Sequence, residues 1–355
     1  MDEILCGISA FRLHRTPPQV LMLCPPLLDA SSADTLAHPL AREILGLPLR
    51  TLATERNNRK QTRTVATQLW CRPIPLGGIM DTILDVQVCS PLFTLLTLAA
   101  YVPETHLEMA MYEFCGTFSV YKPSASVEDA LARAEAQHLF PAGFGWRRVK
   151  DASGNATDLW RRPPLVELDE LRKFADDIQG MHGKKIFVNA SRAITGIAAS
   201  PFESQLSLLW GLPQRKGGKG IFGFTNNAEI RLTRKARLLY PHERCYGDLF
   251  WEGSDAHGPL DVECQGAVIH DDGGALISDS DRTTALNSMG IEVVPITYRQ
   301  IISSKSFDAV TDLIEKKLGI RRHRAKIDNS KREQELRNEL FVDWNALGTY
   351  RRAPN

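Results

Sequence analysis

Apolar and polar residues follow regular patterns in the second half of the chain. Period-two alternation and β-branched composition predict four short strands, at residues 228–240, 245–251, 259–266 and 291–298. Helical spacing of apolar residues predicts four helices, at residues 183–199, 200–212, 279–290 and 303–319. From residue 200 onward the predicted order is α-β-β-β-α-β-α. We therefore expect a mixed α/β domain built around a sheet in this part of the chain.

Capping residues mark where two of the predicted helices begin. Ser200 is suited to the N-cap position, with Pro201 at the first helical position and Glu203 at the third. Ser90 and Pro91 have the same two roles at the start of an apolar helix in the N-terminal part. Each proline favours a helix start because the first turn does not use its missing N–H group.

The remaining sequence predicts an α+β domain and a connector before the α/β domain. Helices are expected at residues 89–102, 105–118, 124–137 and 167–178, and strands at residues 18–24 and 81–90. The segment between the two later helices is rich in Gly, Pro, Arg and Trp, which is typical of loops. The expected divisions are an N-terminal α+β domain at 1–122, a connector at 123–182, the α/β domain at 183–320 and a charged helical tail at 321–355.

Composition and charge narrow the protein class without identifying a function. The 355 residues have a formal net charge of +1, so nothing in the overall charge indicates a nucleic-acid or membrane binder. The seven cysteines include no C-x-x-C pair, which favours reduced thiols and a cytoplasmic protein. The longest apolar run, residues 91–102, is too short to span a bilayer. Any binding role must therefore come from local clusters of residues.

The predicted strand at 259–266 places an acid and an amide together. Strand side chains alternate between faces, so Asp261, Glu263 and Gln265 share one face. The strand before it carries Asp248. Two interpretations are open at this point. The acids are either ordinary polar residues on the solvent face of a sheet or two halves of one site.

The whole pattern resembles the PD-(D/E)xK nuclease superfamily, whose members have a restriction-endonuclease-like αβββαβ core. The closest similarity is to small members related to the very-short-patch repair endonuclease. The matching motifs are YGDLFW with Asp248, LDVECQG with Glu263 and Gln265, and DSDRTTALNSMGIEVVPIT at residues 279–297. The resemblance covers roughly residues 195–320, a little over a third of the chain.

This resemblance implies a metal-dependent endonuclease that hydrolyses DNA. Mg²⁺ or Mn²⁺ would be held by Asp248, Glu263 and the backbone carbonyl of Cys264, because hard cations prefer oxygen ligands. Such an ion generates a hydroxide near neutral pH and offsets charge on the phosphate. Gln265 would orient the attacking water or a phosphate oxygen, and Glu203 on the first core helix would assist. A capping box explains Glu203 equally well.

The sequence departs from the family at one position. Lysine is the family's most common residue where this chain has Gln265, and glutamine cannot supply the positive charge beside the metal. Lys216, Lys219 or Lys235 would have to supply that charge from elsewhere. Catalytic activity is therefore an open question at the level of sequence.

Basic residues around the predicted core suggest where a nucleic acid would bind. The expected phosphate contacts are Arg215, Lys216, Lys219, Lys235 and Arg282. The first three flank a Gly pair in a loop that otherwise has the composition of a solvated hairpin. Arg282 lies three residues after Asp279, so a surface ion pair on one helix is the alternative.

Two functions from different classes fit these observations. The first is a Mg²⁺-dependent nuclease in bacterial defence, repair or mobile-element biology, whose N-terminal domain selects DNA or holds a protein partner or second copy. The second follows from a faint whole-chain resemblance to abortive-infection regulators of the AbiEi antitoxin type. In that interpretation the nuclease-like core is a non-catalytic DNA-binding scaffold, and the glutamine at position 265 favours it.

Overall fold

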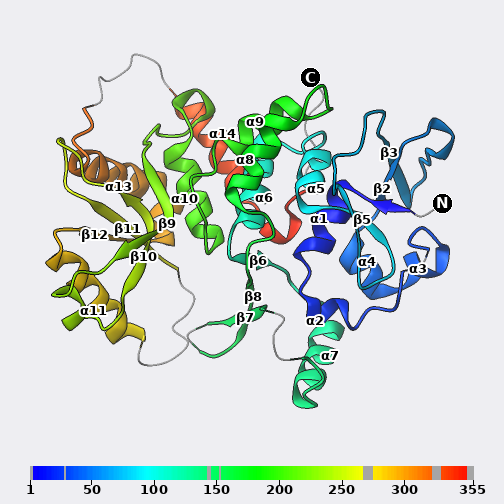
Figure 1. The fold of residues 1–355 in the computed structure, drawn as a ribbon, viewed down its shortest axis with the longest axis horizontal. Helices are drawn as coiled ribbons and strands as arrows, with labels where there is room; N and C mark the ends of the chain where they lie inside the picture. Colours follow the sequence, from blue (N-terminus) through cyan, green and yellow to red (C-terminus); the bar gives the residue numbers. More distant parts are fainter. Residues whose placement is uncertain are drawn as a thin grey trace. The chain divides into compact units, whose positions relative to one another are not determined.

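The protein is a mixed α/β protein with three sheets (Figure 1), as the sequence predicts. The structure is a computed structural model, and it describes residues 3–27, 29–141, 145–151, 153–266, 275–321 and 329–349. None of the helices in these ranges is long and apolar enough to cross a membrane.

The chain divides into two compact units, and each is described by itself. The first unit contains residues 1–147, 158–192 and 343–355, and the second contains residues 148–157 and 193–342. These boundaries differ from the predicted ones in a specific way. Most of the predicted connector belongs to the first unit, and the end of the predicted tail returns to that unit. Residues 322–328 and 350–355 of the tail lie outside the described residues.

The first unit is built on a five-stranded mixed sheet with strand order β3-β2-β1-β5-β4. Its strands are β1 (Ile4–Leu5), β2 (Leu49–Ala53), β3 (Val65–Leu69), β4 (Ile79–Asp81) and β5 (Gln87–Cys89). The helices of this unit are α1 (Gly7–Arg15), α2 (Pro18–Leu21), α3 (Ala33–Ala37), α4 (Pro39–Leu45), α5 (Pro91–Leu98), α6 (Glu104–Cys115), α7 (Ala125–Ala136), α8 (Leu168–Asp177) and α9 (Lys184–Ser191). The third sheet of the protein has the order β6-β8-β7 and contains β6 (Phe118–Val120), β7 (Arg147–Lys150) and β8 (Ala156–Arg161).

One predicted strand in this unit is wrong. Residues 18–24 begin with the short helix α2 rather than a strand. Pro17 and Pro18 start this helix, because proline restricts the backbone to angles that suit the first helical turn. The predicted start of α5 is confirmed, with Ser90 at the N-cap and Pro91 at the first position.

The second unit contains the predicted core order. Its four-stranded sheet has strand order β12-β11-β10-β9, with β9, β10 and β11 antiparallel and β11 parallel to β12. The strands are β9 (Phe224–Arg231), β10 (Arg244–Trp251), β11 (Leu260–Gln265) and β12 (Glu292–Thr297). The helices are α10 (Pro201–Gly211), α11 (Ala275–Ser288), α12 (Tyr298–Ile302), α13 (Ser304–Lys317) and α14 (Ser330–Leu340).

Helices cover both faces of this sheet (Figure 1). Phe250 and Trp251 are neighbours in β10 and therefore point to opposite faces. Trp251 packs near Trp210 of α10, with ring centroids 6.1 Å apart, and Trp210 stacks on Phe307 of α13 at 6.2 Å. Phe250 packs instead on the cluster that includes Leu286 of α11. The sheet is thus enclosed between α10 and α13 on one side and α11 on the other.

Two elements predicted for the α/β domain at 183–320 are shorter than expected. The strand predicted at 228–240 ends at Arg231, and a 3₁₀ turn follows at Ala236–Leu238. The helix predicted at 183–199 ends at Ser191, and Gly196 then forms an isolated bridge with Asn226. A Cβ atom on Gly196 would lie 2.4 Å from the carbonyl oxygen of Asn226, so this close backbone approach requires glycine.

Candidate functional site

The candidate site lies where β10 and β11 pair. Leu249 pairs with Val262 in antiparallel register. Asp248 and Glu263 are the next residues along β10 and β11, and the negative charge of Glu263 raises the pKa of Asp248, so the two carboxyl groups lie near each other.

Asp248 occupies an electrostatically unfavourable position for a carboxylate. Burial raises its pKa well above the usual value, and the negative charges of Glu203 and Glu263 raise it further. The hydrogen bond from the backbone N–H of Cys264 to Asp248 Oδ2, at 2.8 Å, opposes this shift, as does the charge of Arg282. The net effect is a raised pKa, so the ionised carboxylate of Asp248 is not fully compensated by nearby positive charge.

Glu263 has a strong partner on α11. Arg282 Nη2 lies 2.5 Å from Glu263 Oε1, and both side chains are about one-sixth exposed, at 17%. The same guanidinium donates to the backbone carbonyl of Tyr246 on β10. Burial alone would raise the pKa of Glu263, but hydrogen bonds from Asp261 and Arg282 lower it. Arg282 therefore supplies positive charge at this site; the side chain of Asp279, its alternative partner, lies outside the described residues.

Asp261 is a further member of the site that the sequence did not identify as functional. It is 0% exposed, and its Oδ2 lies 3.5 Å from Arg282 Nη2. Burial and the hydrogen bond with Glu263 raise its pKa to about 10, so the carboxyl is protonated at neutral pH. The alternation that places Asp261 and Glu263 on one strand face was the signal available in the sequence.

Gly247 makes room for the Asp261 carboxyl. A Cβ atom at position 247 would lie 2.4 Å from Asp261 Oδ1, a distance that no side chain tolerates. The glycine in the motif YGDLFW therefore has a packing role next to Asp248. Its absence of a side chain allows the buried acid to lie against β10.

Glu203 is held by the start of α10, as the capping interpretation predicts. Its Oε2 accepts the backbone N–H of Ala199 at 2.6 Å, and its Oε1 accepts the hydroxyl of Ser200 at 2.8 Å. Ser200 in turn accepts the backbone N–H of Glu203. Its charge reaches Asp248, as the raised pKa of that residue indicates. One carboxylate thus caps the helix and adds negative potential to the site.

Gln265 and Cys264 occupy the end of β11. Gln265 is exposed, opposite Thr297 of β12. The carbonyl oxygen of Cys264 accepts a hydrogen bond from the backbone N–H of Gly266 at 3.0 Å. Burial raises the pKa of the Cys264 thiol, and the charges of Asp248 and Glu203 raise it further, so this thiol is not a thiolate ligand at neutral pH.

The arrangement fits a hard divalent cation in charge and donor type. Among the residues that the structure describes, no group of three or more His, Cys, Asp or Glu side chains is placed to hold a metal ion. Mg²⁺ commonly takes only one or two protein carboxylates and keeps several waters. Asp248 and Glu263 offer such a pair. The raised pKa of Asp248 means that its ionised form is disfavoured here and would be stabilised by a nearby cation. A metal would compete with Arg282 for Glu263.

The predicted phosphate-contacting residues divide into two groups. Arg215 and Lys235 are exposed, and Lys216 is partly buried. Arg282 is held by Glu263 and lies at the site itself. Arg215, Lys216 and Lys235 are thus accessible to a nucleic acid that binds the second unit, while Arg282 is held inside the site.

Lys219 has a structural role in the second unit. Its Nζ lies 2.7 Å from Asp308 Oδ1 of α13 and 2.7 Å from Glu333 Oε2 of α14, and its side chain is 12% exposed. The adjacent Gly217 and Gly218 pack tightly, since a Cβ atom at Gly217 would lie 2.2 Å from a backbone oxygen of α14. This loop is therefore a packed connection, not the flexible hairpin that its composition indicates.

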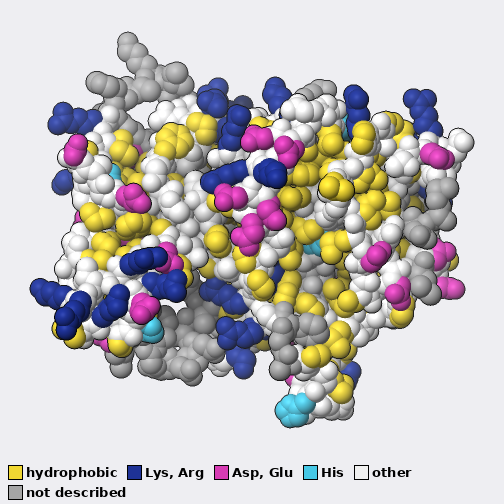
Figure 2. Space-filling model, viewed as in Figure 1, with side chains coloured by type: hydrophobic (Ala, Val, Ile, Leu, Met, Phe, Trp, Pro, Cys, Tyr) yellow, Lys and Arg dark blue, Asp and Glu magenta, His cyan; other side chains and the backbone are white. Residues whose placement is uncertain are grey.

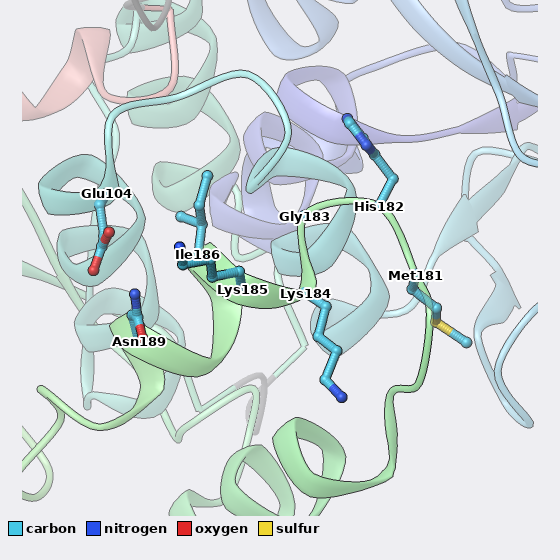
Figure 3. A pocket seen from close by; sticks show the side chains of 8 residues that line it. All are labelled: Glu104, Met181, His182, Gly183, Lys184, Lys185, Ile186 and Asn189. Carbon is cyan, nitrogen blue, oxygen red and sulfur yellow. The ribbon is translucent and has the colours of Figure 1, made fainter. Parts of the chain in front are cut away.

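The first unit contains a cavity of about 660 Å³ beside the start of α9. Figure 3 shows that its polar side chains do not point toward one common position. His182 and Lys184 point in different directions, and Glu104 and Asn189 lie together on another side. Lys184 Nζ is also engaged, since it donates to Gln179 Oε1 at 2.6 Å. The geometry of this cavity does not define a chemical site.

No protein-family profile, curated protein sequence or solved structure matches this chain.

Proposed function

We propose that the second unit is a metal-dependent nuclease core that hydrolyses phosphodiester bonds of DNA. The observation that supports this most directly is the position of Asp248 on β10: it accepts the backbone N–H of Cys264 on β11, and burial together with the charges of Glu203 and Glu263 raises its pKa. Asp248 and Glu263 would hold Mg²⁺ or Mn²⁺, together with the Cys264 carbonyl. The metal, when bound, would activate a water molecule and offset charge on the phosphate.

In this proposal Arg282 supplies the positive charge that the motif lacks at Gln265. Burial works against the charged guanidinium, but Glu263 and Asp261 raise the pKa of Arg282, so it is charged at any physiological pH. Its ion pair orients Glu263, and its planar fork is suited to a phosphate oxygen if Glu263 turns toward a metal. Gln265, exposed at the end of the strand, would hydrogen-bond a phosphate oxygen or a water molecule.

Basic side chains near α11 would hold the DNA backbone. Figure 2 shows Lys and Arg side chains gathered over the part of the second unit that Figure 1 labels α11. The connection between β9 and β10 packs on this helix through Ala236, and it carries exposed cations at Arg234, Lys235 and Arg237. Contacts of this kind give affinity without sequence preference, and they weaken as salt is added.

The test is nicking of supercoiled plasmid by the full-length protein in Mg²⁺ or Mn²⁺, with EDTA as the metal-free control. Asp248→Asn should abolish nicking, and Asp255→Asn, the same change at an exposed acid of the same unit, should not. Asp248→Asn is expected to fold, because it removes a carboxylate that burial and two negative charges disfavour. Nicking by Asp248→Asn at the wild-type rate would refute the proposed role.

A second measurement does not depend on turnover. Mn²⁺ should raise the melting temperature of the wild type and of Asp255→Asn, because a ligand that binds only the folded state stabilises it. The shift should be absent in Asp248→Asn. A wild type whose melting temperature is unchanged at millimolar Mn²⁺ and Mg²⁺ has no metal site of useful affinity.

The second candidate function is a non-catalytic DNA-binding regulator of the antitoxin type. The observation in its favour is the Arg282–Glu263 ion pair, which already gives one of the two carboxylates a cationic partner. Retardation of DNA in a gel without cleavage under any metal, together with no metal-induced stabilisation, would favour this function over the nuclease. Under either function we expect a cytoplasmic protein whose first unit contacts DNA, a protein partner or a second copy.

A further inference from the structure

The first unit contains a second, smaller cavity whose wall is positively charged. It has a volume of about 130 Å³ and lies between the start of α1, the segment that follows α4, and the end of α5. Arg12 of α1 and Arg50 of β2 both line it, with Tyr101 beside Arg50. Among the described residues that form its wall there is no Asp or Glu. Two guanidinium groups therefore face a small space without a lining carboxylate.

Arg12 has spare hydrogen-bond donors. Its Nη2 donates to the backbone carbonyl of Glu43 at 2.7 Å, and this is its only hydrogen bond to the described parts of the chain. The side chain lies close to Gly46, where a Cβ atom would be 3.2 Å from Nε and Nη1. Burial lowers the pKa of Arg12 and the charge of nearby Arg15 lowers it further, while Tyr121 and Glu43 oppose this shift. The carboxylate of Glu43 is itself engaged by Tyr121 and by a backbone N–H group.

Arg50 is held by stacking and makes no side-chain hydrogen bond within the described ranges. Its guanidinium carbon lies 5.1 Å from the centre of the Tyr101 ring, a geometry that fixes the orientation of the plane. Its backbone N–H donates to Ser9 Oγ at 2.9 Å, which attaches this part of β2 to α1. The position of Arg50 is therefore set by its backbone and by an aromatic ring, while the donors of its guanidinium group are available to a ligand.

The start of α1 adds backbone donors to the same wall. Cys6 is the N-cap residue, and its side chain makes no capping hydrogen bond. Gly7 N–H donates to Thr97 Oγ1, but the N–H groups of Ile8 and Ser9 have no acceptor among the residues that the structure describes. Gly7 and Ile8 line the cavity. Free N–H groups at the N-terminus of a helix favour an anion.

We propose that this cavity binds a phosphate group, as inorganic phosphate or as the terminal phosphate of a small monoester. Two guanidinium groups and the free N–H groups provide more donors than the two oxygens of a carboxylate accept, and they match the oxygens of a phosphate dianion. A volume of about 130 Å³ accommodates the phosphate but not the body of a nucleotide, which would remain at the opening beside exposed Leu47. The proposal concerns the first unit alone and does not depend on the nuclease function of the second.

The test is calorimetric titration of the full-length protein with sodium phosphate in EDTA, at an ionic strength held constant with sodium chloride. The wild type should bind, and Arg50→Gln should bind roughly tenfold to a hundredfold more weakly, because a charge-assisted hydrogen bond is lost. Arg42→Gln is the matched control, since Arg42 is an exposed arginine of α4 that does not line the cavity. If Arg50→Gln does not fold, Arg50→Lys serves instead. It keeps the positive charge but loses the planar guanidinium group that donates paired hydrogen bonds, so it should also bind phosphate more weakly.

Further titrations with glycerol 3-phosphate and with acetate distinguish the sources of the anion. Binding of phosphate alone indicates the free anion, and binding of phosphate and glycerol 3-phosphate indicates a monoester site. Both results support the proposal when the Arg50 variants weaken them. Binding of acetate without phosphate, no binding of any probe at millimolar concentration, or equal affinity in wild type and Arg50 variants would overturn it.

Discussion

The protonated carboxyl of Asp261 leads to a specific prediction about pH and stability. Asp261 is fully buried against Gly247, and neither of its oxygens accepts a hydrogen bond from the part of the chain that the structure describes. The carboxyl can instead donate its proton toward Glu263. Asp261→Asn keeps the shape and supplies an N–H donor that no longer titrates. We therefore expect the variant to be more stable than the wild type at neutral and alkaline pH.

The sign and size of the effect follow from proton linkage. The pKa of Asp261 is about 10 in the folded protein, and about 3.9 in an unfolded chain. The folded state binds the extra proton between these values, so the stabilisation is complete below about pH 4 and is lost as the pH rises. Each pH unit in this window changes the free energy of unfolding by up to about 1.4 kcal/mol. From pH 5 to 8 the wild type should lose at most about 4 kcal/mol through this group.

Neighbouring acids do not obscure the comparison. Glu263 has a lowered pKa, so its contribution is present above its usual value of 4.5 and is lost only below that pH. Asp248 has a raised pKa and adds a slope of the same sign as Asp261, but wild type and variant share it. The quantity to compare is therefore the difference in slope between the two proteins.

Urea unfolding at pH 5, 6, 7 and 8 in EDTA measures this slope. Asp261→Asn should show a smaller loss of stability with pH, by up to about 1.4 kcal/mol per unit. Asp255→Asn, at an exposed aspartate, should keep the wild-type slope. Equal slopes for wild type and Asp261→Asn would refute the protonated state of Asp261, and with it the electrostatic description of the site.

Three further substitutions test packing and capping in the second unit by chemical denaturation. Gly247→Ala should destabilise by about 1–3 kcal/mol, because its Cβ would lie 2.4 Å from a buried carboxyl oxygen that must then shift, while Gly258→Ala, with nothing within 4 Å, should be close to neutral. Lys219→Met should cost about 1–3 kcal/mol, because it leaves two carboxylates without their shared partner, and 0.5 M salt should not reproduce this loss. Ser200→Ala should cost about 1 kcal/mol through loss of the N-cap bond to Glu203 N–H, and Ser200→Thr should restore most of it. A neutral Gly247→Ala, Lys219→Met or Ser200→Ala would contradict the respective contact.

The local sequence determined the strands and helices of the second unit and the relation of its two acids. Period-two alternation predicted the consecutive strands β10 and β11, which pair antiparallel as far as Leu249 and Val262, the neighbours of Asp248 and Glu263. The S-P-x-E pattern predicted the start of α10 and the capping role of Glu203. These features depend on residues a few positions apart or on the faces of single strands, so the sequence pattern contains them.

The tertiary structure alone decided which partners the charged groups have. Arg282 reaches Glu263 because α11 packs on the sheet, and Lys219 is shared by two carboxylates because α13 and α14 meet there. The protonation of Asp261 likewise depends on burial that no local pattern shows. Arg12 and Arg50 line one cavity because β2 lies beside α1. Burial and long-range proximity arise from the docking of whole elements, and they set the charge state and availability of each side chain.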